Sequence, residues 1–362
     1  MNCASGAIKR RRRTFYITQA CRANAAARPT TAMKSIKNTL TLLALCTCLT
    51  TVQAQTALIE QVDSMLEARR EKSFARYDTA YIGKPGGKWT VKLRANASGT
   101  NLYTDGTINN SQFNAQLESE LRATAGVTVS YRGLSLGFAV NPAKQAGRSK
   151  DNEFSLSSYG NRMGVDIVYT SAKTFSGEAE YGGNAYSIEQ GRVEMDVLQA
   201  NAYYAFSHRR FSFPAAFSQS QVQKRSCGSW LLGLSAFAGR ISSATDVVQG
   251  IGSKRLTTIN VAIGGGYAYN FVIKRKWLLH LSAMPHIVVF SHNRLTVGDT
   301  RQHAPYRFPS LINVGRVATV RNFKNSFIGM SAVVNLWRQG DKDDMLIENV
   351  KWRARLFYGV RF

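Results

Sequence analysis

The last twelve residues of the chain, Lys351–Phe362, alternate between apolar and largely cationic side chains. Because successive side chains of a β-strand point to opposite faces, this stretch predicts a strand with one apolar and one cationic face. About 9–11 tilted residues cross a bilayer as a barrel strand, with the apolar side toward lipid. The stretch therefore favours a transmembrane barrel over its alternative, the last strand of a soluble sandwich. The apolar set is Trp352, Ala354, Leu356, Tyr358, Val360 and Phe362.

Aromatic residues stand near both ends of this strand, where barrel strands meet the two membrane interfaces. Trp352 lies near one end, and Tyr358 and Phe362 lie near the other. A final strand that ends in Phe also resembles the C-terminal signal of bacterial outer-membrane barrels. We therefore expect Tyr358 and Phe362 to act as an assembly signal for the barrel-assembly machinery.

The first 54 residues contain nine Lys or Arg and no acidic residue. A basic segment at 33–37 is followed by an apolar stretch at 39–51 and by small residues up to Ala54. This order is typical of a secretory signal peptide. We expect residues 33–54 to be a cleaved signal peptide and residues 1–32 to be a non-native upstream extension.

Charge and cysteine content support export. The formal net charge is +25, and without residues 1–54 the balance is 38 basic against 22 acidic residues. The run Arg10–Arg13 is an alternative signal for nucleic-acid binding, but because an export signal follows it we expect no nucleic-acid partner. Only Cys227 lies after the leader, so we expect no disulfide framework, metal site or cofactor. No later stretch has ~18 consecutive apolar residues, so an exported chain of this kind is periplasmic, secreted or an outer-membrane barrel.

After the leader, one helical pattern precedes a long β region. Apolar residues recur at helical spacing within 55–76, and 77–87 is rich in turn-forming residues. We expect residues 55–87 to form a periplasmic helix and lead-in, with a plug at the barrel mouth as the alternative, and residues 88–362 to form one barrel. The strand candidates are 88–97, 117–131, 134–140, 153–170, 192–206, 211–217, 229–240, 256–271, 277–290, 311–320, 326–337 and 346–362.

This pattern predicts an all-β fold, a closed antiparallel transmembrane barrel of about twelve strands, with ten to fourteen possible. An even number places both ends of the barrel in the periplasm. Two connections fit this scheme badly: 171–191 becomes a long turn on the periplasmic side, and Ser207–Arg210 becomes a tight turn on the outer side of the membrane. A further strand near Phe175–Tyr181 would change the assignment.

Closure of the barrel places its first strand beside its last, because an open edge in lipid leaves backbone groups unpaired. Cations of both strands then share the lumen and repel one another where water is scarce. We expect Arg94 and Arg353 to interact with Glu118 or Glu120, with a positive excess left over. This excess would make an open pore anion-selective, whereas in a closed lumen the network itself would be the plug. The predicted lumenal network is Lys88, Lys92, Arg94, Glu118, Glu120, Arg353 and Arg355.

Two further groups of residues are candidates for chemistry. His280 and Ser282 share the polar face of strand 277–290, in the His-x-Ser spacing of outer-membrane phospholipases. Nucleophilic catalysis needs a serine, a base beside it and a group that orients the base, but the flanking Ser and Asn motif of those enzymes is absent. We therefore interpret His280 and Ser282 by default as polar residues that face the lumen. The second group is a basic cluster that would contact anions or lipid headgroups, or simply form a solvated turn: His208, Arg209, Arg210, Lys224 and Arg225.

From Tyr77 to the C-terminus the chain resembles the domain of unknown function 4421 family, exported proteins of Bacteroides-type bacteria. The residues that carry the resemblance are Tyr77–Ile82, the block Ser207–Gln219 with its continuation Gln223–Trp230, and Tyr267–Asn270. The resemblance implies an outer-membrane β protein and brings no activity or catalytic residues with it.

We therefore expect a monomeric outer-membrane barrel that contacts outer-membrane lipids and works as a narrow pore or handles a lipid or saccharide. Two alternatives stay open. One is a lipid hydrolase that uses Ser282 and His280, although the sequence favours a protein that is not an enzyme. The other is a structural barrel whose lumen is filled with side chains.

Overall fold

The computed structural model describes residues 60–108, 110–132, 134–147, 150–244, 253–297, 300–303, 310–340 and 345–362. The chain divides into two compact units, Met1–Ser64 and Met65–Phe362, and the strands belong to the second. The predicted leader segments 1–32 and 33–54 lie outside the described residues. In the part of the chain that the structure describes, no helix is both long and apolar enough to cross a membrane.

A helix at 60–74 and a turn-rich lead-in precede the sheet. The elements that follow are β1 (Ile82–Gly83), β2 (Trp89–Ile108), β3 (Ser111–Glu118), β4 (Arg122–Tyr131), β5 (Leu134–Val140), α2 (Pro142–Gln145), β6 (Asn152–Tyr159), β7 (Met163–Ala172), β8 (Ser176–Tyr181), β9 (Asn184–Ile188), β10 (Val193–Ala205), α3 (Phe213–Phe217), β11 (Val222–Gln223), β12 (Cys227–Ser243), β13 (Lys254–Ile273), β14 (Trp277–Val297), β15 (Thr300–His303), β16 (Leu311–Asn322), β17 (Ser326–Gln339) and β18 (Met345–Arg361).

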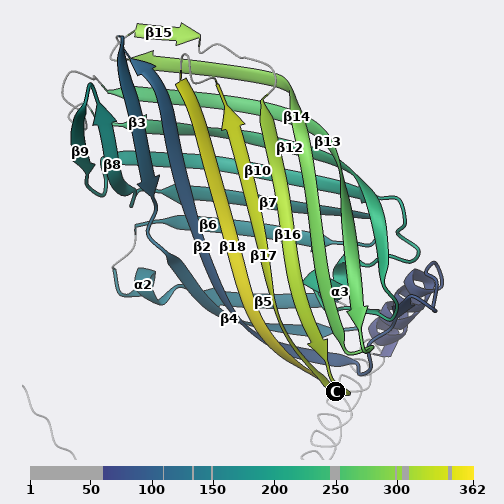
Figure 1. Cartoon of the computed structure of the whole chain (residues 1–362). Helices are drawn as coiled ribbons and strands as arrows, with labels where there is room; N and C mark the ends of the chain where they lie inside the picture. Colours follow the sequence, from purple (N-terminus) through teal and green to yellow (C-terminus); the bar gives the residue numbers. More distant parts are fainter. Residues whose placement is uncertain are drawn as a thin grey trace, which may run out of the picture. The chain divides into compact units, whose positions relative to one another are not determined.

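One curled antiparallel sheet of sixteen strands contains all of these strands except β1 and β11 (Figure 1). The last strand, β18, pairs with β2 along most of its length, as predicted from closure. From β18 the ladder continues through β17, β16, β14, β13, β12, β10 and β7 to β6. On its other side β2 pairs with β4, which pairs with β5, and farther along with β3, which leads to β8 and β9. The predicted fold class, an all-β transmembrane barrel with a short N-terminal helix, is confirmed; among the described residues the ladder itself does not close, because β5 and β6 do not pair with each other.

Side chains alternate between the lumen and the outside, as the final strand predicted. Leu356 and Tyr358 of β18 are 57% and 46% exposed, whereas the intervening Phe357 is 2% exposed. The outward positions of the neighbouring strands are also large and apolar, as a lipid-facing surface requires. Examples are Leu93, Val127, Leu198, Leu232, Ile263, Leu281, Val317 and Ile328, each at least 41% exposed.

Two of the twelve predicted strands are wrong, because one is two strands and the other is a helix. Twelve strands of the sheet still correspond to the prediction, and β3, β8, β9 and β15 are additional. The candidate 153–170 is two strands, β6 and β7, with a turn between them. The candidate 211–217 contains the short helix α3, because the Ser212 side chain accepts from the backbone N–H of Ala215 and Pro214 suits a first helical turn. With both corrections, 171–191 and 206–226 lie at opposite ends of the barrel. The first connection also holds the hairpin β8–β9, close to the further strand considered near Phe175–Tyr181.

A bulge reverses the side-chain alternation between β3 and β4. Both strands run antiparallel to β2, but the three residues 119–121 stand opposite only Gly99 and Thr100. One extra residue exchanges the inner and outer faces of a strand. Leu117 is therefore buried in the lumen, whereas Leu121 is 60% exposed.

Candidate functional site

A plug fills the lumen at the end of the barrel that holds the C-terminus. It is formed by residues 206–226, the connection between β10 and β12, and every residue of α3 is buried. The ring of Phe213 packs 4.2 Å from that of Tyr203, and the ring of Phe217 stacks 4.9 Å from that of Tyr159. These aromatic contacts fix the plug against the inner faces of β10 and β6.

Lys92 of the predicted lumenal network and a second cation, Arg361, hold this plug rather than line a pore. Lys92 Nζ donates to Gln219 Oε1 at 3.0 Å, and Lys92 is 8% exposed. Arg361 Nη2 donates to the backbone oxygen of Gln219 at 3.1 Å. Gln219 has a positive φ of 60°, which turns its carbonyl and side chain toward these two strands.

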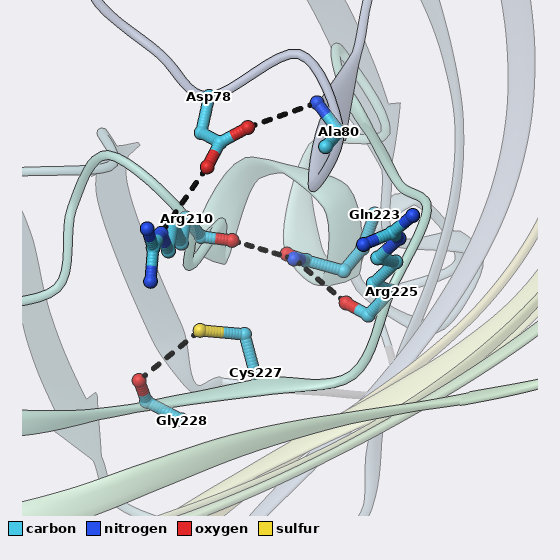
Figure 2. A network of polar contacts seen from close by, with 7 residues as sticks. All are labelled: Asp78, Ala80, Arg210, Gln223, Arg225, Cys227 and Gly228. Carbon is cyan, nitrogen blue, oxygen red and sulfur yellow. Dashed lines mark hydrogen bonds and ion pairs between the residues drawn. The ribbon is translucent and has the colours of Figure 1, made fainter.

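The lead-in is attached to the outer side of the plug by the predicted basic cluster. Figure 2 shows Arg210 beside Asp78, with Arg210 Nε 3.2 Å from Asp78 Oδ2. The Gln223 amide donates to the backbone oxygens of Arg210 and Arg225 at 2.6 and 3.1 Å. The backbone N–H of Asp78 donates to the Arg209 oxygen at 2.8 Å, so the protein's own lead-in occupies much of this cluster.

The other cluster members also have partners in the chain. Lys224 donates from Nζ to the Thr79 oxygen at 2.9 Å, and the Arg225 guanidinium lies 5.9 Å from the Tyr81 ring centroid. His208 Nδ1 lies 3.3 Å from the Ala205 oxygen. These contacts use two of the three stretches that carried the family resemblance, the lead-in and the central block. They make the cluster a clamp, while anion binding by it stays a prediction.

A hydrogen-bonded chain of three residues lies under the plug. Asn270 Nδ2 donates to the Ser212 oxygen, which turns its Oδ1 toward His280 Nδ1 at 2.7 Å. The His280 Nδ1 must then carry the proton, so Nε2 accepts from Ser282 Oγ at 3.1 Å. His280 and Asn270 are 0% exposed and Ser282 is 9% exposed. The rings of Phe211, Phe213 and Phe217 surround His280.

Above the plug lies a polar cavity of about 470 Å³, here called the chamber. Its walls come from β2, β4, β5, β6, β17 and β18, and Phe217 of the plug forms part of its floor. Serine, threonine, asparagine and small side chains make up most of the other lining. The charged residues that line it are four arginines and one glutamate: Arg94, Arg122, Arg353, Arg355 and Glu153.

Two ion pairs neutralise part of this positive charge. Arg353 pairs with Asp166 of β7, whose side chain is 1% exposed and also accepts from Ser157. Lys351 Nζ lies 2.6 Å from Glu153 Oε2 of β6. Both pairs join β18 to strands on the other side of the lumen.

Three chamber arginines still have free hydrogens. Arg94 Nε, Arg122 Nη1 and Arg353 Nε are buried and have no hydrogen-bond partner. Arg355 Nε donates to Asn96 Oδ1 at 2.8 Å. The chamber therefore keeps the positive excess that the sequence predicted.

The predicted partners of these arginines are wrong. Glu118 lies on the outer face of β3, because the bulge at 119–121 exchanges the two faces between β3 and β4, and Glu120 lies within the bulge itself. Glu118 is exposed and accepts from Asn101 Nδ2 at 2.8 Å, and Glu120 is also exposed. Lys88 is exposed at the end of the barrel and does not reach the chamber.

The far end of the lumen is filled with apolar side chains. Trp337 and Phe237 stack with ring centroids 4.4 Å apart, and neither is more than 1% exposed. Leu117 and Val193 belong to the same cluster. A separate apolar cavity of about 130 Å³ lies here, lined in part by Phe113. Among the described residues, no group of three or more His, Cys, Asp or Glu could hold a metal ion.

The end of β18 joins the start of β2. The Phe362 N–H donates to the Trp89 oxygen at 3.0 Å, and the Phe362 oxygen accepts from Lys88 and Trp89. Tyr358 points outward beside Ile328 and Leu93 in the ladder. This geometry is compatible with an assembly role, which stays a prediction.

Sequence reasoning missed Asn270, Asp166 and Gln219. The short gap between the predicted strands 256–271 and 277–290 contained the signal for Asn270, since a hairpin centred there sets Asn270 opposite His280. Asp166 and Gln219 meet their partners across the lumen, and alternation along one strand says nothing about such contacts.

The family model for a domain of unknown function, DUF4421, matches residues 76–362. The chain belongs to this family. The match covers the clamp, the plug and the whole sheet, so these features lie within the family domain. A comparison with curated proteins finds no match.

Solved structures of other barrels are similar to this DUF4421 chain at low identity. The outer membrane protease OmpT from Escherichia coli is 8% identical with a TM-score of 0.40, over 77% of this chain and 97% of that chain. The translocator domain of the autotransporter NalP from Neisseria meningitidis is 8% identical with a TM-score of 0.29, over 83% and 95%. The outer membrane protein OprG from Pseudomonas aeruginosa is 9% identical with a TM-score of 0.27, over 77% and 98%. These values give no argument about what this chain binds.

Proposed function

We propose that this protein is an outer-membrane barrel that binds the anionic group of a lipid or saccharide inside its lumen. The unpaired guanidinium hydrogens of Arg94, Arg122 and Arg353 carry this proposal. A buried N–H without an acceptor costs about 1–3 kcal/mol, and more when the group is charged. A phosphate or carboxylate would supply the missing acceptors, because guanidinium groups bind such oxyanions through paired hydrogen bonds.

The filled lumen supports a binding barrel over an open pore. The plug occupies one end and the Phe237–Trp337 cluster occupies the other, so the chamber lies between two packed regions. In this proposal the protein is a monomer in the outer membrane. It contacts outer-membrane lipids and is inserted by the barrel-assembly machinery.

Binding of small anionic probes to purified protein in a neutral detergent would test the proposal. The probes are inorganic phosphate, glucose 6-phosphate and dihexanoyl phosphatidate, with dihexanoyl glycerol as the uncharged control. We expect the phosphorylated probes to bind and the uncharged one not to. The Arg94→Gln change should weaken binding about tenfold or more, because Arg94 Nε is one of the unpartnered donors and a hydrogen bond to a charged group contributes about 1.5–3 kcal/mol.

Arg338→Gln is the matched control, because Arg338 is an outward arginine paired with Glu348 at 3.1 Å and its side chain is 49% exposed. This variant should bind like the wild type. Absence of binding by all three phosphorylated probes, or an equal loss in both variants, would contradict the proposal.

A second candidate function is lipid ester hydrolysis, which the chain Asn270–His280–Ser282 favours. The Asn270 amide oxygen fixes the His280 tautomer whose Nε2 can take the Ser282 proton. Ser282 Oγ would attack the ester carbonyl, the proton would pass through His280 to the leaving alcohol, and water would release the fatty acid. The plug covers these residues, so activity would require the plug to move. If the plug stays in place, the same hydrogen bonds simply anchor it.

Fatty-acid release from phosphatidylglycerol in mixed micelles distinguishes these roles. Ser282→Ala should abolish release, while Ser291→Ala should not, because Ser291 lies farther along β14 and bonds to Asn260 at 2.6 Å. If neither the wild type nor a variant without residues 212–220 releases fatty acid, the hydrolase candidate is wrong.

A further inference from the structure

We propose that the barrel wall opens sideways between β5 and β6, and that the anionic headgroup of a membrane lipid enters the chamber through this opening while its acyl chains stay in the bilayer. The inference rests on the proposed function of the chamber and specifies its ligand as a lipid. The region between β5 and β6 is called the seam below.

The first observation is that the backbone ladder ends at the seam. Among the described residues, β5 pairs only with β4, and β6 pairs only with β7. Unpaired backbone groups in hydrocarbon cost several kcal/mol each, which is why transmembrane sheets close. At the seam, the wall therefore either forms hydrogen bonds between β5 and β6 or stays open to a ligand.

The second observation is that both faces of the two seam strands are exposed. Leu136 and Phe138 on the outer face of β5 are 84% and 73% exposed. The inward residues Ser155 and Ser157 of β6 are exposed as well. By contrast, every inward residue of β10 is buried. The seam thus exposes lumenal side chains that the rest of the wall covers.

The third observation is that the chamber reaches this seam. Its lining includes Ser135, Gly137 and Ala139 of β5, all small and exposed. Leu156, which alternation places on the outer face beside Ile167, also lines the chamber. A cavity lined by an outward residue extends around the edge of its strand. The chamber therefore opens toward the lipid side at β6.

The charges behind the seam select the ligand. A Cβ built on Gly137 would lie 3.0 Å from Arg94 Nη2, so this guanidinium reaches the seam strand itself. Arg353 stands across from it, paired with Asp166, which in turn holds Ser157 of β6. Around the opening the outer surface is apolar. A site with cations inside and apolar residues outside fits a lipid with a phosphate or carboxylate headgroup. A free sugar phosphate would leave the apolar rim uncovered. The rim residues are Leu136, Phe138, Phe154 and Leu156.

Site-specific photocrosslinking in vesicles tests the seam. A benzophenone amino acid would replace Phe138 or Phe154, in vesicles of one part phosphatidylglycerol to three parts phosphatidylcholine. The matched controls are Leu93 and Leu198, which lie two strands away in the same ladder rows. We expect the phosphatidylglycerol share of the adducts to exceed its bulk share at least threefold at both seam sites. At the control sites the adducts should match the bulk.

The Arg94→Gln change should remove the excess at the seam, because Arg94 is the guanidinium that reaches the seam strand, and should leave the controls unchanged. Equal shares at seam and control sites would overturn the lateral opening. If dihexanoyl phosphatidate still binds in detergent in that case, only this inference fails and the chamber keeps its proposed function. If none of the three anionic probes binds either, the proposed function fails too. Two seam sites, each checked for heat-modifiable migration on gels, keep the test valid when one substitution prevents folding.

Discussion

Replacing Asp166 with asparagine should destabilise the barrel far more than any surface charge change. Asp166 is 1% exposed and pairs with Arg353, whose side chain is 13% exposed. Removing one partner of a buried ion pair leaves the other charge uncompensated, which costs about 3–5 kcal/mol. Asparagine keeps an acceptor for Ser157 and Arg353, so we expect the lower end, about 3 kcal/mol. This loss corresponds to roughly a hundredfold change in the unfolding equilibrium constant.

The measurement is urea unfolding of the protein refolded into lipid vesicles, followed by tryptophan fluorescence. Glu348→Gln is the control, because its ion pair with Arg338 has side chains that are 30% and 49% exposed. Exposed pairs contribute about 0–1 kcal/mol, so this variant should unfold close to the wild type.

The double variant Asp166→Asn with Arg353→Met measures the coupling between the two charges. It removes both charges, so it should be more stable than Asp166→Asn alone, with a coupling free energy of at least about 1 kcal/mol. An Asp166→Asn protein within about 1 kcal/mol of the wild type would refute the buried-pair argument. So would losses that simply add in the double variant.

Three further predictions concern assembly and the lumen. Deleting Phe362, or changing Tyr358 to Asp, should lower the heat-modifiable fraction on gels. The reasons are that Phe362 closes the ladder with Trp89 and that a charge on the lipid face costs up to ~2–4 kcal/mol. Resistance of these variants to urea extraction at the wild-type level would contradict this prediction. Deleting residues 212–220 together with the changes Phe237→Ala and Trp337→Ala, which removes the filling at both ends of the lumen, should raise single-channel conductance at least several-fold and give an anion-selective reversal potential, and cation preference would show that the chamber charge is misjudged. In that opened barrel Glu118→Gln should leave the selectivity unchanged, because Glu118 is exposed on the outer face of β3, and a clear shift toward anions would place it inside.

The sequence by itself determined the class of the fold and the orientation of the final strand. Strict alternation from Lys351 to Phe362 sets the cations inward and the apolar residues outward, whatever the neighbours are, because the side-chain period of a strand is fixed at two. The same rule, with closure, placed β18 beside β2. It also predicted a positive lumen, since Arg353 and Arg355 could point nowhere else.

Local exceptions to alternation were invisible in the sequence. The extra residue at 119–121 turned Glu118 outward, and nothing in the residues themselves marks a bulge, which depends on the register with β2. The apolar pattern of 211–217 reads as a strand, yet the Ser212 cap and Pro214 favour a helix once the segment is enclosed in the lumen. In both cases the conformation depended on the strands that pair with the segment or enclose it.

Only the tertiary structure assembled the candidate sites. Arg353 meets Asp166, Lys351 meets Glu153, and His280 meets Asn270, and each pair joins separate strands. The two edges at β5 and β6 follow from which strands find partners, a property of the whole ladder. Alternation is a local property of the backbone and can be read residue by residue, whereas contacts across a lumen depend on how the entire sheet curls.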